Sequence, residues 1–352
     1  MIASAAANAK AERGERMRNR DTFRGCLIGG AAGDVLGYAV EFMPKSLIYK
    51  KYGPRGITEY ALTDGVARIS DDTQMTLFTA DGLLLGGDYP SSIRRCYLDW
   101  LKTQEMRFPL GGGPYASRLL NEPKLFSPRA PGNTCLSALH QGGDGTPEEA
   151  INQSKGCGGV MRVAPIGLYF GDRGYNAKQV ARLGAQAAAL THGHPLGWMP
   201  AAMLAQIIYE ISQDGESLWN AAAHALDGMN EAGPDRAACL SLTGLIEKAM
   251  ALAGADKSDP DAIRTLGEGW TGDEALAIAL YCALKYPSDL DSALIAAVNH
   301  GGDSDSTGAI AGNIVGAMIG YERIPSKYKE HLELHELILQ MADALWQGGE
   351  AP

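Results

Sequence analysis

The sequence predicts an all-α protein that folds as one compact helical bundle. Apolar residues recur three or four positions apart over much of the chain, whereas alternating, strand-like runs are scarce. No low-complexity linker divides the 352 residues into comparable halves, and a chain with 45% hydrophobic residues can bury a large core. We therefore expect a single domain over residues 21–350, preceded by a short arm over residues 1–20.

The expected helices follow one another along the chain. Helical spacing extends over residues 73–85, 177–190, 200–211, 217–229, 273–284, 291–298, 307–320 and 327–346. Capping residues mark helix starts in PSDLDSAL (287–294) and TPEEAINQ (146–153), and GITEYAL (56–62) suggests a marginal hairpin. Asp34 lies within a further helix of small residues, where its carboxylate could simply hydrogen-bond a neighbouring backbone.

Composition excludes several classes of function. The formal net charge is −10, and no cluster of Lys and Arg follows the first twenty residues, so we expect no nucleic-acid partner. The six cysteines include no Cys-x-x-Cys pair, which disfavours a zinc ribbon or a thioredoxin-like site. The N-terminus lacks the apolar core of a signal peptide, and no run reaches the roughly 20 apolar residues of a membrane span. We expect a cytoplasmic protein without membrane association.

Two acidic clusters, far apart in the sequence, each begin an expected helix. Residues 70–72 are Ser-Asp-Asp, and residues 303–306 are Asp-Ser-Asp-Ser. Either cluster alone is more often a helix cap and dipole partner than a set of ligands. If the two helix starts face one another, however, their oxygens suit two hard cations such as Mg²⁺ or Mn²⁺. The cations would also relieve the repulsion between the carboxylates.

The segment KGCGGVMR contains three closely spaced glycines, Gly156, Gly158 and Gly159. Their backbone N–H groups can form a nest for a diphosphate, although composition alone favours an ordinary tight loop. The segment has neither the Gly-Lys-Ser/Thr of a P-loop nor the spacing of a Rossmann fingerprint. His192 and His194 lie two residues apart, without a third nitrogen or sulfur ligand nearby, so we expect pocket-wall or helix-terminus histidines rather than a zinc site.

Several separated motifs together resemble the ADP-ribosylglycohydrolase family, which includes the dinitrogenase reductase-activating glycohydrolases. They are GCLIGGAAGDVLGYAVEF, SDDTQMT, KGCGGVMRVAPIGL, THGHP and NHGGDSDSTGAIAGNIVGAMIG. Each motif is short, but their order and spacing are specific, and the resemblance covers nearly the whole of residues 22–325. The resemblance implies an all-α bundle with a binuclear magnesium or manganese centre at the bottom of a cleft that receives ADP-ribose.

The resemblance also implies roles for individual residues. The metal ligands would be Ser70, Asp71, Asp72, Asp303, Asp305 and Ser306. The substrate-binding residues would be Gly156, Gly158, Gly159, Met161, Arg162 and His192. Arg162 is either a phosphate partner or a residue that braces the loop, and GGGPYASR (111–118) is a candidate loop over the cleft. Glu41 and Asp303 are the candidates for proton transfer, and Glu41 could instead act only as a gate.

The implied function is metal-dependent hydrolysis that removes ADP-ribose from a modified protein side chain and so reverses an ADP-ribosyltransferase. The arginine-directed branch of the family is the more similar one, and hydrolysis of serine-linked or other O-linked ADP-ribose is the alternative. Residues 1–20 are basic, which leaves two interpretations: a disordered tail, or an arm with which an antagonist or immunity protein binds and blocks an ADP-ribosyltransferase. A third hypothesis is a non-catalytic scaffold stabilised by metal.

Overall fold

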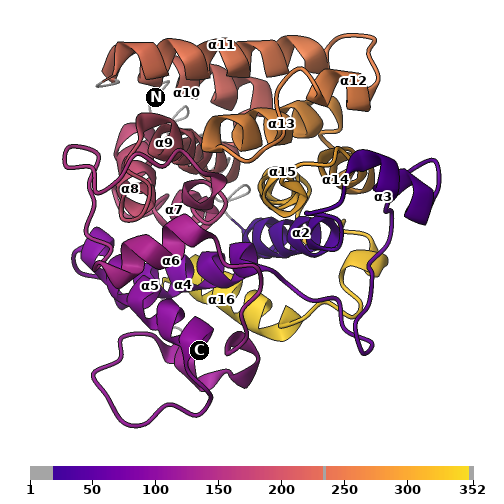
Figure 1. Cartoon of the computed structure of the whole chain (residues 1–352). Coiled ribbons are helices and arrows are strands. Elements are labelled where there is room, and N and C mark those ends of the chain that lie inside the picture. The colour runs from indigo at the N-terminus through magenta and orange to yellow at the C-terminus, as the bar shows by residue number, and fades with distance from the viewer. Residues whose placement is uncertain (1–18, 233–234, 349–352) are drawn as a thin grey trace, which may run out of the picture.

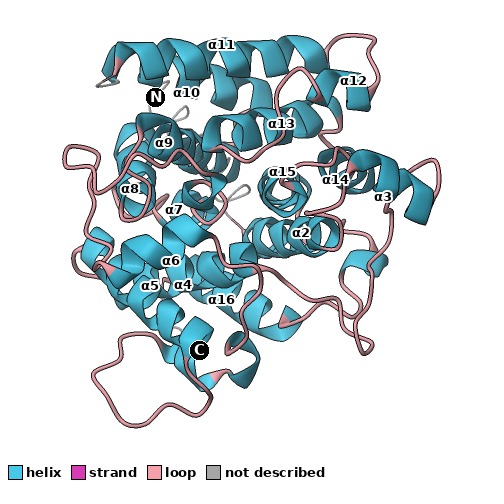
Figure 2. Cartoon of the chain, viewed as in Figure 1, coloured by secondary structure: helices cyan, strands magenta, loops and turns pink. Residues whose placement is uncertain are grey.

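A computed structural model describes residues 19–232 and 235–348, and the all-α prediction is confirmed. Across these two ranges there are helices and three isolated β-bridges but no strand, as Figure 2 shows. The α-helices, labelled in Figure 1, are α2 (Arg20–Tyr38), α3 (Lys45–Tyr52), α4 (Asp71–Leu85), α5 (Tyr89–Glu105), α6 (Asn133–His140), α7 (Ala164–Tyr169), α8 (Ala177–Ala189), α9 (Pro195–Tyr209), α10 (Leu218–Ala232), α11 (Arg236–Ala253), α12 (Asp259–Ile263), α13 (Gly272–Lys285), α14 (Leu290–Val298), α15 (Ser304–Ile319) and α16 (His335–Gln347). Short 3-10 turns and one π-turn (Glu210–Asp214) complete the described elements.

Helices α2 and α15 pack backbone to backbone through glycines. Glycine recurs at every fourth position of residues 25–37, and residues 308–316 repeat the same spacing. A Cβ on Gly29 would lie 2.3 Å from the Gly312 carbonyl oxygen, and a Cβ on Gly33 would lie 1.9 Å from that of Gly308, so no larger residue fits. The antiparallel pair, side by side in Figure 1, brings the end of α2 to the start of α15.

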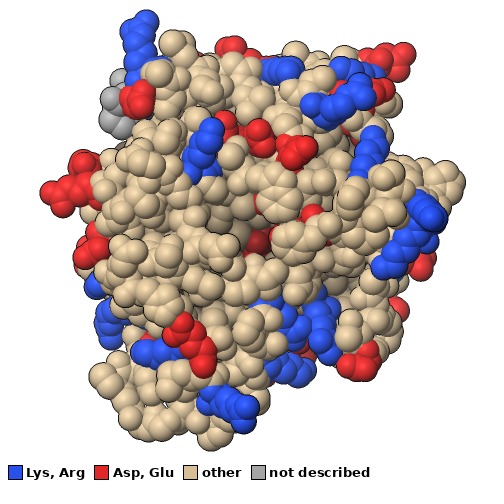
Figure 3. All heavy atoms as spheres, viewed as in Figure 1, with Lys and Arg blue, Asp and Glu red and all other residues tan. Residues whose placement is uncertain are grey.

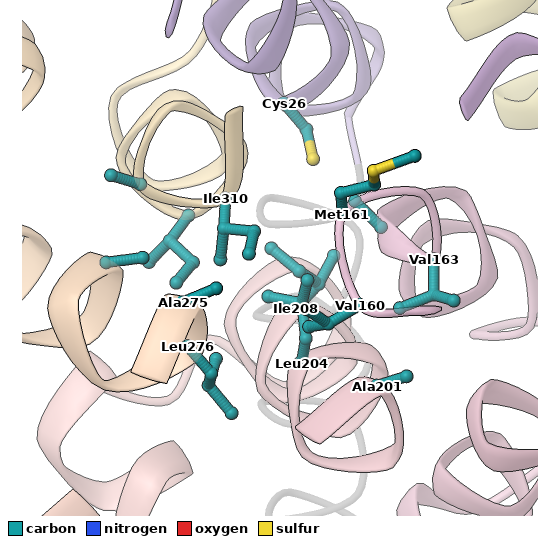
Figure 4. Packing of buried hydrophobic residues seen from close by; sticks show 14 of the residues in the cluster. Cys26, Val160, Met161, Val163, Ala201, Leu204, Ile208, Ala275, Leu276 and Ile310 are labelled. Atoms are coloured by element: carbon teal, nitrogen blue, oxygen red, sulfur yellow. The ribbon is translucent and has the colours of Figure 1, made fainter. Parts of the chain in front are cut away.

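The hydrophobic core connects this pair to α9 and α13. Figure 4 shows Ile310 of α15 facing Ala275 of α13, and Val160 beside Ile208 of α9. All four side chains are fully buried. Because Val160 belongs to this core, the glycine loop that precedes it is attached to the interior of the bundle.

Three sequence expectations are wrong. The helix expected over 327–346 begins only at His335, because residues 331–333 instead bond to the backbone of Ala67, with His331 and Leu334 in the left-handed region. Residues 146–153 form a local turn in which Thr146 and Glu149 bond to each other. Residues 56–62 form no hairpin, because the backbone of Ile57 bonds to the side chain of Asn299. Helices α5 and α11 were not expected.

The arm lies largely outside the described residues, which begin at Asn19. Arg20 is already the first residue of α2, and its Nε lies 2.7 Å from Asp343 Oδ1 of α16. The hypothesis that residues 1–20 bind a transferase therefore stays a prediction. Among the helices of the two described ranges, none is both long enough and apolar enough to span a membrane.

Candidate active site

The two acidic helix starts line one cavity of about 320 Å³. Asp71 and Asp72 of α4 face it together with Asp303, Asp305 and Ser306 at the start of α15. Figure 3 shows acidic side-chain atoms inside a hollow near the middle of this face of the molecule. The structure thus brings together residues that are more than two hundred positions apart in the sequence.

Glu41, Asp303 and Asp305 form the tightest acidic cluster in this cavity. One carboxylate oxygen of each lies within 4.8 Å of the others, and all three residues are buried. Asp303 and Asp305 both accept a hydrogen bond from the Ser306 N–H, at 3.3 and 2.9 Å. Glu41 Oε2 and Asp72 Oδ2 are buried without a partner, which is costly unless a ligand supplies one.

The start of α4 is positioned by Asp34 of α2. Asp34 accepts hydrogen bonds from the backbone N–H groups of Ser70, at 3.0 Å, and of Thr73, at 3.1 Å, and another from the Thr73 hydroxyl. The expectation that Asp34 bonds to a neighbouring backbone is confirmed. Burial raises the pKa of Asp34 to about 6, although these hydrogen bonds favour the charged form. Ser70 caps α4 through its own side chain, is fully buried and does not line the cavity.

A second set of contacts holds Asp71. Its carboxylate accepts the Gly132 N–H at 3.2 Å, and its own N–H donates to the Arg129 carbonyl at 3.0 Å. Arg129 in turn pairs with Glu333 at 3.0 Å, and Glu333 also accepts the Ile69 N–H at 3.1 Å. The segment that includes Gly132 therefore forms a wall of the cavity next to the acidic cluster.

The cavity's electrostatics oppose ionisation of all its acids at once. Burial, followed by the charges of Asp305 and Asp71, raises the pKa of Glu41 to about 10. Burial and neighbouring acids likewise raise the pKa of Asp71, Asp72 and Asp305. Within the described residues no Lys or Arg pairs with any of these four carboxylates. Oxygen-only donors, two of them without a partner, fit one or more hard cations.

The glycine loop contributes another part of the cavity wall. Gly156, Gly158 and Met161 line it, whereas Gly159 packs against α9, where a Cβ would lie 2.5 Å from the Gly197 carbonyl oxygen. The loop is tied to the segment before α13, because the Cys157 N–H donates to the Trp270 carbonyl at 3.3 Å.

Arg162 lies behind the loop and does not line the cavity. Its side chain is fully buried, donates to Thr191 Oγ1 at 2.6 Å and to the Ala187 carbonyl at 3.1 Å, and stacks on the Tyr97 ring. Of the two roles left open by the sequence, these contacts are those of a brace. His192 does line the cavity, and burial and the charge of Arg162 lower its pKa to about 3, so the ring is neutral.

His194 is a helix-terminus histidine, since its Nδ1 accepts the Leu196 N–H at 3.0 Å at the start of α9. The loop 111–118 contributes no residue to the cavity lining. Its end is held against α5 by Asp99, which accepts the Ala116 and Ser117 N–H groups at 2.7 and 2.9 Å, and against α4 by Asp81, which accepts the Ser117 hydroxyl at 2.5 Å.

Sequence reasoning missed two aromatic residues of the cavity, Phe42 and Trp270. Their rings are stacked, with centroids 6.2 Å apart and planes at 20°. The only local signal was position, because Phe42 follows the candidate acid Glu41 and Trp270 follows a glycine just before a helix. The wall formed by residues 130–135 was missed as well.

The protein is thus an all-α bundle whose cavity joins a buried, oxygen-only acidic cluster to a glycine loop, a lining that suits a hard cation and a small ligand. A sequence model of the ADP-ribosylglycohydrolase family matches residues 15–352. The chain belongs to the ADP-ribosylglycohydrolase family, which makes it a glycohydrolase of ADP-ribose. The family is metal-dependent, in agreement with the buried acidic cluster.

Two curated relatives illustrate the similarity. ADP-ribosylhydrolase ARH3 of Mus musculus is 28% identical over 357 residues, covering 93% of this chain and 92% of that protein. ADP-ribosyl-[dinitrogen reductase] glycohydrolase of Rhodospirillum rubrum is 27% identical over 350 residues, covering 92% of this chain and 95% of that protein. A solved structure described as an ADP-ribosylglycohydrolase-related protein complex has the same fold, with a TM-score of 0.64 and 23% identity over 94% of this chain and 99% of that one.

Proposed function

We propose that the protein hydrolyses the N-glycosidic bond between ADP-ribose and a modified arginine side chain of a protein, and so reverses an ADP-ribosyltransferase. The observation that carries this proposal is the cavity itself. It places a buried acidic cluster next to a glycine loop, so that cations and an anionic diphosphate can be held side by side. The relative named as a glycohydrolase of ADP-ribosyl-dinitrogen reductase supports a modified protein as the substrate.

The proposed cofactors are two Mg²⁺ or Mn²⁺ ions, which prefer oxygen ligands. The proposed ligands are Ser70, Asp71, Asp72, Asp303, Asp305 and Ser306, of which all but Ser70 line the cavity, and Glu41 lies beside them. Bound cations of this kind polarise ligand oxygens and lower the pKa of bound water. Glu41 Oε2 and Asp72 Oδ2 have no hydrogen-bond partner within the protein, so both oxygens are available to a bound ion or ligand.

The chain's own residues divide the remaining work. Gly156 and Gly158 allow the diphosphate to approach the loop backbone, and neutral His192 contributes a hydrogen-bonding wall without adding charge. The carboxylates stabilise the positive charge that develops on the ribose as the glycosidic bond breaks. Glu41 and Asp303 are close enough together to hold and move a proton at the departing group.

The test is release of ADP-ribose from an arginine-ADP-ribosylated protein with Mg²⁺, with Mn²⁺ and with EDTA. We expect release with metal, none with EDTA, and none for Asp303→Ala, whose helical circular dichroism should stay close to that of the wild type. Calorimetric titration of the metal should show weaker binding to the variant. A serine-linked substrate is tested in parallel, and faster release from it would replace the arginine assignment with hydrolysis of O-linked ADP-ribose. Undiminished release by Asp303→Ala would contradict the proposed site.

A further inference from the structure

The cavity carries two exposed aromatic side chains at its open side. Phe42 is 71% exposed and Trp270 is 40% exposed, yet both contribute to the lining of the cavity that holds the acidic cluster. Their near-parallel rings come from segments far apart in the sequence and contact each other with 6.2 Å between centroids. An apolar pair that faces water beside a site is typical of a surface that contacts a ligand.

Trp270 is fixed between the glycine loop and the start of α15. Its carbonyl accepts the Cys157 N–H at 3.3 Å. Two residues earlier, the Glu268 carbonyl accepts the Asp303 N–H at 2.8 Å, and the Glu268 N–H donates to Glu274 of α13 at 3.1 Å. The backbone that carries the indole is therefore held by contacts with the glycine loop and with the start of α15.

Phe42 reaches the open side of the cavity from the turn that follows α2. It directly follows Glu41, in a turn closed by the Met43 N–H, which donates to the Val40 carbonyl at 2.9 Å. Because the Glu41 carboxylate points into the acidic cluster, the next side chain stands at its outer edge. The two rings thus border the place where the bond between ADP-ribose and its acceptor must lie.

Geometry decides which part of a substrate would reach these rings. A cavity of about 320 Å³ accommodates a small molecule but not a folded protein. The ADP-ribosyl part must therefore extend inward, toward Gly156, Gly158 and His192. The modified side chain, which stays attached to its protein, must leave toward solvent, where Phe42 and Trp270 are exposed.

We infer that Phe42 and Trp270 form the subsite for the modified acceptor side chain and that they favour arginine over serine. This inference rests on the proposed function. A guanidinium is planar and cationic, so it stacks on aromatic faces and is attracted by their negative quadrupole. A serine linkage offers neither a planar face nor a positive charge.

The experiment uses two peptides that differ only in the modified residue, ADP-ribosyl-arginine or ADP-ribosyl-serine. We compare kcat/KM on both peptides, with metal, for the wild type, Phe42→Leu and Trp270→Leu. The arginine-to-serine ratio should fall about tenfold in each Leu variant. The affinity for free ADP-ribose, measured as inhibition, should be unchanged. Trp270→Phe, which keeps an aromatic face, should retain most of the preference.

Trp219→Leu is the matched control, because Trp219 of α10 is 52% exposed and lies outside the cavity. It should alter neither the ratio nor the inhibition. An equal loss on both peptides, or an unchanged ratio, would overturn the inference and leave the proposed function standing. Weaker inhibition by ADP-ribose in the Leu variants would also overturn it, since the rings would then hold the nucleotide. No release from either peptide by the wild type would instead contradict the proposed function, and the inference with it.

Discussion

The two helix starts that carry the acidic residues are fixed to the protein by different means. At α4, side chains do the positioning: Asp34 accepts the N–H groups of Ser70 and Thr73, and Glu333 accepts that of Ile69. At α15, the backbone does it, because glycines allow direct contact with α2 over four turns. The α4 start therefore depends on a few hydrogen bonds, whereas the α15 start depends on the absence of side chains.

This difference predicts different responses to mutation. Hydrogen bonds can be lost one at a time, and each loss costs a limited amount of free energy. Close contact between two backbones cannot relax locally, so one added methyl group must move a whole helix. Helix α2 provides both Asp34 and the glycine face. A mutation that displaces the start of α4 or of α15 should therefore change the geometry of the acidic cluster.

The largest effect is expected at the glycine contact. In Gly308→Ala, the new Cβ would lie 2.5 Å from the Gly33 carbonyl oxygen, which belongs to backbone and cannot rotate away. We expect a loss of about 3 kcal/mol or more in the free energy of unfolding, measured in urea, together with loss of metal binding.

Gly244→Ala is the control for that substitution. Gly244 lies in α11, where an added Cβ would meet nothing within 4 Å. This variant should be as stable as the wild type or more stable by up to about 1 kcal/mol, because alanine favours the helix. Equal stability of Gly308→Ala and Gly244→Ala would mean that α2 and α15 can separate without cost. The close backbone contact would then not be what fixes the start of α15.

A smaller effect is expected at the side-chain contact. Asp34→Ala leaves the buried N–H groups of Ser70 and Thr73 without an acceptor, which should cost about 2 kcal/mol of unfolding free energy. Asp34→Asn keeps one oxygen acceptor and should lose about half as much. Faster hydrogen exchange at the Thr73 amide, with that at Ala309 of α15 unchanged, would locate the damage at α4. Equal acceleration at both amides would show that the two starts are not held independently.

Local signals explain what could be predicted of the fold and site. The helical spacing of apolar residues predicted helices such as α4, α8 and α13, and the acidic residues at the starts of α4 and α15 indicated where these two helices begin. The position of Asp34 within a helix of small residues was enough to suggest a hydrogen bond from its carboxylate to a neighbouring backbone. The glycines at every fourth position in residues 25–37 were a usable signal for helix packing, but the partner helix was not identifiable from them.

What could not be predicted depends on long-range contacts. Residues 327–334 have helical periodicity, but their backbone bonds to Ala67, a partner that no local pattern reveals. Arg162 follows the glycine loop like a phosphate ligand, yet Thr191 and the Tyr97 ring hold it in the interior. Phe42 and Trp270 meet only because the turn after α2 and the segment before α13 converge at the cavity.

The smallest effect is expected at the far end of α2, where its first turn is attached to α16. Asp343 accepts hydrogen bonds from Arg24, at 2.7 Å to each oxygen, and from Arg20. Burial alone would raise the pKa of Asp343, but the two guanidinium groups outweigh it and hold the pKa at about 2. Because the folded-state pKa is below the unfolded value, the contribution is present at neutral pH and is lost as the pH falls from about 4 to about 2.

Asp343→Asn should therefore cost only about 1 kcal/mol at neutral pH, since solvent screens a partly exposed pair. The stability difference from the wild type should shrink below pH 4. Asp64→Asn is the control, because Asp64 is 87% exposed in its pair with Arg68 and should cost nearly nothing at any pH. Metal affinity should stay unchanged in both variants, because the opposite end of α2 is fixed independently by its glycines. Weaker metal binding in Asp343→Asn would mean that α2 transmits disturbance along its whole length, so that the two helix starts are not held separately.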